Sequence, residues 1–334
     1  METKKKAVLI AAVIISLIIS SIAISNPLLV DRFFYRMGFQ EQVCFPIIDE
    51  EFQSDNVTNI AAVADFGINE NSITTLKNIQ SNNPEVILFA GDLGQSTAEK
   101  WIESSEFFGT ENVYVVIGDG DLPKERDKFR EHYALNNDYY SFDYENIHFL
   151  AIATGDCTAA DCIVISNDKM QLDFIRTDLS YASDDPETDF TVVYMHLPMY
   201  SSRMAGSFVD LKNELQPMFD LYGVDLVISG HKHAYERTHP VMFDNIITDY
   251  GKCSYNNPDG QIYITVGTGG HSHSTFKHKQ PWSVITNHND FGFLNIKVVN
   301  DGKTLYGEFM SNTGKIMDAF QINLNSQSIK NLEG

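Results

Sequence analysis

Short apolar runs alternate with amphipathic stretches from residue 57 onward. Five runs are continuously apolar and each is followed by a polar residue: 60–64, 86–90, 113–117, 191–195 and 226–229. Runs of this length without alternation are typical of strands that are buried on both faces. Helical spacing falls between them, at 72–80, 97–107, 168–181 and 211–222. This order of strands and helices predicts an α/β fold.

The second half of the region is rich in strands. Four apolar or alternating runs follow one another without a helical stretch between them: 261–266, 291–299, 304–310 and 315–323. No linker rich in proline or glycine divides residues 56–325. We therefore predict one domain over 56–325, followed by a C-terminal tail at 326–334.

The N-terminus has a different pattern. Three lysines, Lys4 to Lys6, precede an apolar run at 7–25 that only serine interrupts. The run is about as long as a bilayer requires, and the lysines favour an N-terminus on the inside. We predict a signal anchor at 1–25 with a transmembrane helix at 7–25, and a connector at 26–55. The alternative is a signal peptide cleaved at the small residues 23–25.

Both alternatives place the domain outside the cytoplasm, either as a single-pass protein of the cell membrane or as a secreted protein. The four cysteines, Cys44, Cys157, Cys162 and Cys253, then permit two disulfides. Cys157 and Cys162 share one polar loop and are the preferred pair, with four free thiols as the alternative.

Composition narrows the classes of function. The chain has 334 residues, is 43% hydrophobic and contains 22 Phe and 15 Tyr, so it can build a large core. Its formal net charge of −21 repels nucleic acid, and we expect no nucleic-acid-binding surface. An anionic substrate would need local positive charge, which bound metal ions supply. The sequence does not indicate an oligomeric state.

The polar residues that follow the five apolar runs are all aspartate or histidine: Asp65, Asp92, Asp119, His196 and His231. Ligands of open α/β sheets gather at the carboxyl ends of strands. A single aspartate there is usually a turn or cap residue, but histidine is a poor cap and five in succession favour a metal site. His233 lies two positions after His231, so both side chains can reach one site. Carboxylates and imidazoles together suit zinc, iron or manganese.

The segment 230–237, Gly-His-Lys-His-Ala-Tyr-Glu-Arg, resembles a signature of the calcineurin-like metallophosphoesterases, in the purple acid phosphatase branch. Further segments resemble that family's motifs in the expected order: 91–94, 139–143, 147–150, 196–202 and 266–270. The resemblance covers about residues 57–323. It implies a four-layer αββα sandwich with two mixed β-sheets.

The resemblance also implies a dinuclear centre of two metal ions, iron, zinc or manganese. One ion would be held by Asp65, Asp92 and His233. The other would be held by Asp119, His196, His231 and the bridging Asp92. The implied reaction is hydrolysis of a small phosphate monoester by a metal-bridging hydroxide. A phosphodiesterase or nucleotide hydrolase on the same centre is one alternative, and a metal-binding surface protein with weak activity is another.

The sequence departs from the branch at positions that bear on activity. Gln95 stands where the branch has a tyrosine ligand, so we expect no purple colour, although its amide oxygen can still offer a ligand. Asp119 replaces an asparagine, and Gly120 replaces a histidine that contacts the phosphate or the leaving oxygen. Ala205 and Gly206 stand where a further histidine often lies.

Other residues can take over these tasks. Arg203 can hold a phosphate oxygen, because a guanidinium suits that geometry, or it is a solvated loop residue. His271 or His273 can supply the missing acid, or both are surface histidines. The candidate catalytic residues are therefore Asp92, Asp119, Arg203 and His271. We expect Glu236 and Arg237 to support the ligands from below as a charge pair.

Overall fold

The computed structural model describes residues 57–154, 168–203, 206–276, 278–299 and 302–324. The predicted transmembrane helix at 7–25, the connector, the tail and the pair Cys157–Cys162 lie outside these residues. Within them, no helix is both long enough and apolar enough to cross a membrane. All of them belong to one unit, Gln42–Gly334.

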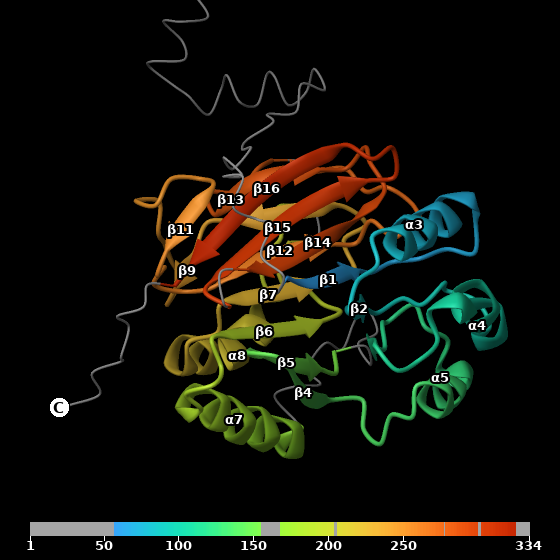
Figure 1. Ribbon diagram of the computed structural model, residues 1–334, viewed down its shortest axis with the longest axis horizontal. Coiled ribbons are helices and arrows are strands. Elements are labelled where there is room, and N and C mark those ends of the chain that lie inside the picture. Colours follow the sequence, from blue (N-terminus) through green and yellow to red (C-terminus); the bar gives the residue numbers. More distant parts are fainter. Residues whose placement is uncertain (1–56, 155–167, 204–205, 277, 300–301, 325–334) are drawn as a thin grey trace, which may run out of the picture. The chain divides into compact units, whose positions relative to one another are not determined.

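Two seven-stranded sheets form the centre of this unit (Figure 1). In spatial order, the first sheet contains β11 (Ser254–Asn256), β16 (Ile316–Asn323), β15 (Thr304–Ser311), β14 (Gly292–Val299), β1 (Thr58–Val63), β2 (Val86–Ala90) and β3 (Val113–Val116). The second contains β13 (Ser283–Asn287), β8 (Tyr235–Thr238), β12 (Ile262–Val266), β7 (Leu226–Ser229), β6 (Phe190–Met195), β5 (Ile147–Ile152) and β4 (Tyr140–Tyr144). A two-stranded hairpin, β9 (Val241–Met242) and β10 (Asn245–Ile246), stands apart.

Both sheets combine parallel and antiparallel neighbours, which confirms the predicted α/β class with two mixed sheets. β1, β2 and β3 are parallel, whereas β15 pairs antiparallel with both β14 and β16. In the second sheet β5, β6, β7 and β12 are parallel, and β4 and β8 pair antiparallel with their neighbours. The nine predicted strands agree with the observed ones to within two residues at each end.

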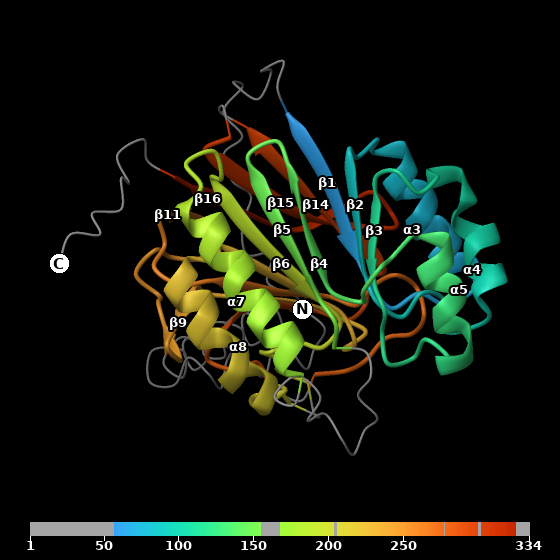
Figure 2. The same cartoon turned by 90° about the horizontal axis from the view of Figure 1, so that it is seen from below.

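Helices cover the outer sides of the sheets. α3 (Glu70–Ser81), α4 (Ala98–Ser105) and α5 (Arg126–His132) lie beside β1–β3, and α7 (Lys169–Asp184) and α8 (Val209–Tyr222) lie against the second sheet (Figures 1 and 2). Short 3₁₀ turns occupy Glu106–Phe108 and Pro123–Glu125. The sequence pattern missed α5, because its seven residues bury only one apolar side chain, Phe129.

The core has two parts, which explains the continuously apolar strands. One cluster lies between the two sheets, extends outward to α3 and α4, and includes Phe149, Phe309 and Trp101. A second cluster lies between the second sheet and α7 and α8, and includes Met195 and Phe219. The second sheet is therefore covered on both faces, and all six residues of β6 are buried.

His148 links α7 to the edge of the second sheet. Its Nδ1 lies 2.7 Å from Asp143 of β4, and its Nε2 lies 2.9 Å from Asp178 of α7. Burial works to lower the pKa of His148, but the two aspartates outweigh it and raise the pKa above its usual value.

A raised histidine pKa stabilises the fold at low pH. The stabilisation is fully present below about pH 6.5, the value in the unfolded chain, and is lost as the pH rises through the folded value. We expect His148→Gln to cost more unfolding free energy at pH 6 than at pH 9. Urea unfolding of both proteins at the two pH values measures this, and a difference that does not change with pH would contradict it.

Candidate metal centre

All six predicted ligands leave the sheets at the carboxyl ends of strands. Three aspartates follow the parallel strands of the first sheet: Asp65 after β1, Asp92 after β2 and Asp119 after β3. The histidines come from the second sheet: His196 follows β6, and His231 and His233 lie between β7 and β8. The structure brings them together in two groups, Asp65–Asp92–His233 and Asp119–His196–His231, with the ligand atoms of each group within 4.8 Å of one another.

Four of the ligands occupy the left-handed backbone region, which is uncommon for residues other than glycine. The φ angles are 64° for Asp65, 56° for Asp92, 67° for His231 and 34° for His233. Each such residue costs of order 1–3 kcal/mol, and such residues cluster at functional sites. The tight turns directly after the strands direct these side chains toward one another.

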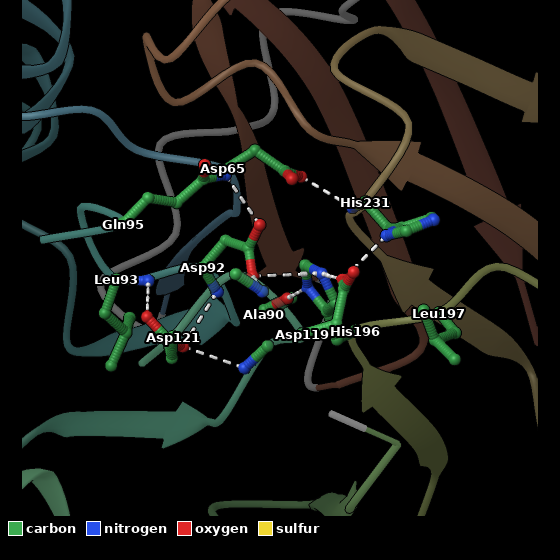
Figure 3. A network of polar contacts seen from close by, with 12 residues as sticks. Asp65, Ala90, Asp92, Leu93, Gln95, Asp119, Asp121, His196, Leu197 and His231 are labelled. Atoms are coloured by element: carbon green, nitrogen blue, oxygen red, sulfur yellow. Dashed lines mark hydrogen bonds and ion pairs between the residues drawn. The ribbon is translucent and has the colours of Figure 1, made fainter. Parts of the chain in front are cut away.

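Asp92 lies between the two groups (Figure 3). Its Oδ1 is 3.3 Å from Nε2 of His196, which belongs to the other group. In that group, Oδ1 of Asp119 lies 2.8 Å from both Nε2 of His196 and Nδ1 of His231. On the opposite side, Nε2 of His233 lies 3.2 Å from Oδ1 of Asp65. A carboxylate in this position can serve as a ligand to both groups.

Outer contacts orient the ligands. Nδ1 of His196 donates to the carbonyl of Ala90 at 2.8 Å, so Nε2 is the nitrogen that faces the site. Nδ1 of His233 is hydrogen-bonded to Ser272 at 2.7 Å, which likewise directs its Nε2 inward. Thr154 accepts hydrogen bonds from the backbone N–H groups of His196 and Leu197, at 3.1 and 3.0 Å. Contacts of this kind are typical of metal-binding histidines.

The electrostatics of the site suit cations. Burial raises the pKa of Asp92. The charge of His196 lowers this pKa, but the charges of Asp65 and Asp119 raise it further, and the net shift is upward. Burial works in the same direction on Asp119, but hydrogen bonds to His196 and His231 hold its pKa well below the usual range. Burial disfavours the charged form of His196, but the surrounding carboxylates raise its pKa to about 10. The carboxylates therefore need nearby positive charge.

The donor set fits two metal ions of the kinds predicted. Oδ1 of Asp65 is buried and has no hydrogen bond of good geometry among the described residues, so a carboxylate oxygen is left facing the first group. Three carboxylates and three imidazoles are ligands that iron, zinc and manganese accept.

Asp121 holds the site together and was not among the predicted site residues. Its buried carboxylate accepts backbone hydrogen bonds from Asp92 at 3.1 Å, Leu93 at 2.7 Å and Gly118 at 2.8 Å. It thus ties the turn after β2 to the turn after β3. Burial and the charge of Asp92 raise the pKa of Asp121 to about 7. Its position two residues after Asp119 was the only available signal in the sequence.

The three other candidate residues lie at unequal distances from the centre. The positive charge of Arg203 is close enough to work against the raised pKa of His233. The ring of His271 lies 4.9 Å from the ring of His233, and its backbone N–H donates to the Asp65 carbonyl at 3.1 Å. His273 instead stacks on Phe291 at 3.8 Å. Of the three, His271 contacts the ligands directly, whereas Arg203 and His273 lie within electrostatic reach of His233.

Glu236 and Arg237 do not pair with each other, so this expectation was wrong. Glu236 accepts hydrogen bonds from the backbone and hydroxyl of Ser202. Arg237 makes a two-point contact with Asp318, at 2.5 and 2.8 Å. The physical reason is that neighbouring residues of β8 point to opposite faces of the sheet.

The Calcineurin-like phosphoesterase family model matches residues 58–235, which is more than half of the chain. The chain belongs to the calcineurin-like phosphoesterase family. A second model, Iron/zinc purple acid phosphatase-like protein C, matches residues 260–319. Members of the purple acid phosphatase group carry two metal ions, and the two groups of ligands described above correspond to them.

Individual relatives agree with this assignment. The chain is 24% identical to purple acid phosphatase 23 and 28% identical to purple acid phosphatase 22, both of Arabidopsis thaliana, over 72% and 75% of its length. It spans only 59% and 60% of those two proteins. The structure of purple acid phosphatase PPD1 from yellow lupin matches 82% of the chain and 55% of its own length, with a TM-score of 0.70 and 22% identity, and shows the shared fold.

Proposed function

We propose that this protein is a metal-dependent phosphoesterase that hydrolyses small phosphate monoesters outside the cytoplasm, tethered by its N-terminal segment. The observation that carries the proposal is the position of Asp92 between two complete groups of ligands. Purple acid phosphatases 22 and 23 support the phosphatase assignment by their names and similarity.

The two metal ions, when bound, would polarise the phosphoryl oxygens and lower the pKa of water so that it can attack at neutral pH. Asp65, Asp92 and His233 would hold one ion, and Asp119, His196 and His231 the other, with Asp92 shared. The protein's own part is to fix these six side chains through the backbone turns and outer contacts described above.

Two further residues act on the substrate in this proposal. Arg203 carries a guanidinium within electrostatic reach of His233, and in this proposal it binds a phosphate oxygen. His271 lies beside His233 and donates a proton to the leaving oxygen. Burial and the charge of His233 lower the pKa of His271, so its protonated form is available mainly under acidic conditions.

Two observations support a location of the domain outside the cytoplasm: the N-terminal pattern and one cysteine. Lysines followed by the apolar run at 7–25 favour export. Cys253 is disulfide-bonded, and its partner lies outside the described residues. Disulfides persist mainly outside the cytoplasm, which supports an exported domain.

The test is metal analysis of the purified full-length chain, with assays on p-nitrophenyl phosphate and bis-p-nitrophenyl phosphate. We expect two metal ions per chain, faster hydrolysis of the monoester, loss of activity with a chelator and recovery when metal is restored. The chelated protein should also unfold more easily, because free metal at 100 times its Kd contributes about 2.7 kcal/mol of stability per site.

Other results would select the alternatives. A preference for the diester would make the protein a phosphodiesterase. Two bound metals without turnover of either ester would make it a metal-binding protein. A chain that binds no metal in stoichiometric amount, even after reconstitution, would overturn the assignment of the six ligands.

A further inference from the structure

Both oxygens of the Asp92 carboxylate are held by hydrogen-bond donors. The backbone N–H of Gly120 donates to Oδ1 at 2.7 Å. The side-chain amide of Gln95 donates from Nε2 to Oδ2, also at 2.7 Å. Gln95 lies beside Asp92 in Figure 3 and has a φ of 45°, again in the left-handed region. Its amide nitrogen, not its oxygen, faces the carboxylate, which differs from the ligand role expected from the sequence.

Gln95 and Gly120 depend on each other sterically. A Cβ added at Gly120 would lie 2.7 Å from Oδ2 of Asp92 and 3.0 Å from Cδ of Gln95. These distances are shorter than ordinary contacts between such atoms. A side chain at position 120 would therefore displace Gln95 or the carboxylate that it holds. The absence of a side chain at 120 is the condition under which Gln95 can reach Asp92.

We propose that Gln95 is a positioning residue for the shared carboxylate Asp92, and that Gly120 provides the space which this contact needs. The proposal deepens the function proposed above and rests on its two-metal centre. The Asp92 carboxylate belongs to one group and also reaches His196 of the other, so its rotation decides how its oxygens are shared. Outer partners of metal ligands typically contribute 10–100-fold to metal affinity.

The test uses Zn²⁺ titration calorimetry on the metal-free, full-length chain, and therefore does not depend on turnover. Gln95→Met keeps the length of the side chain but removes the donor. We expect it to weaken at least one of the two Zn²⁺ binding events by about 10–100-fold. It should also change the visible absorption of the Co²⁺-loaded protein, because that spectrum reports ligand geometry. Binding of both Zn²⁺ ions as tightly as in the wild type would overturn the proposal.

A matched control makes the same substitution far from the site. Gln321 of β16 donates from Nε2 to Ser254 of β11 at 3.0 Å. Gln321→Met should leave both Zn²⁺ affinities and the Co²⁺ spectrum unchanged. If it weakens Zn²⁺ binding as much as Gln95→Met does, the effect is general and the proposal falls.

A second pair of variants tests the steric dependence and does not rely on Gln95→Met folding well. Gly120→Ala should weaken Zn²⁺ binding partly by displacing Gln95. The double variant Gln95→Ala/Gly120→Ala should therefore lose less affinity than the single variants Gln95→Ala and Gly120→Ala predict together. Losses that simply add would contradict the pairing. The two proposals can fail separately. If the wild type binds two Zn²⁺ ions but hydrolyses neither ester, the proposed function is wrong, whereas the role of Gln95 is still decided by the Zn²⁺ affinities.

Discussion

Asparagine in place of Asp92 should reduce phosphoester hydrolysis by on the order of 10³-fold or more. Metal-ion catalysis contributes several kcal/mol, and each ~1.4 kcal/mol is a factor of ten in rate. The Asp92 carboxylate belongs to one group and lies 3.3 Å from Nε2 of His196 in the other, whereas asparagine has only one oxygen and no charge. The variant should therefore retain less than two metal ions per chain, which elemental analysis measures together with the rate.

The same substitution should leave the metal-free fold intact. Burial raises the pKa of Asp92, which means that its charge is unfavourable in the metal-free protein. Asparagine removes that charge but leaves one of the two donors, Gly120 or Gln95, without an acceptor, so metal-free Asp92→Asn should unfold at about the same temperature as the metal-free wild type. Asp127→Asn is the matched control, because Asp127 is exposed and pairs with Arg130 on α5, away from the metal ligands. Full activity with two bound metals in Asp92→Asn would contradict the assignment of Asp92.

The strands and the ligands could be predicted from sequence because one physical pattern defines both. A strand covered on both faces reads as a continuous apolar run, and the first polar residue after it marks the sheet edge. β2 and β7 were predicted to the residue, and Asp92 and His231 follow at those edges. The resemblance to the family then assigned the ligands to two groups, and the structure brings the same groups together.

The contacts that orient the ligands could not be predicted in this way. Asp121 meets Asp92 across 29 positions, and Thr154 meets His196 across 42. Such pairs depend on how the strands are ordered, which local patterns do not contain. The direction of Gln95 is a similar case, because it depends on the space left by Gly120, a residue of the next strand's turn.

The pairing of Arg237 was missed for the same reason, and it leads to the largest expected effect on stability. Arg237 of β8 and Asp318 of β16 come from different sheets and are both almost fully buried. Arg237 donates to Asp318 through two nitrogens and to the hydroxyl of Tyr255, and Tyr235 also donates to Asp318. The four side chains form a polar connection between the two sheets.

Asp318→Asn should destabilise the protein by about 3–5 kcal/mol, because it leaves the Arg237 charge buried without a counter-charge. Urea unfolding measures this loss. Asp173→Asn is the matched control: Asp173 pairs with Arg176 on the exposed face of α7, where such a pair contributes about 0–1 kcal/mol. If both variants lose the same small amount, the buried pair does not hold the sheets together. If Asp318→Asn alone is strongly destabilised, its metal-loaded form should gain back part of the loss, because metal binding favours the folded state.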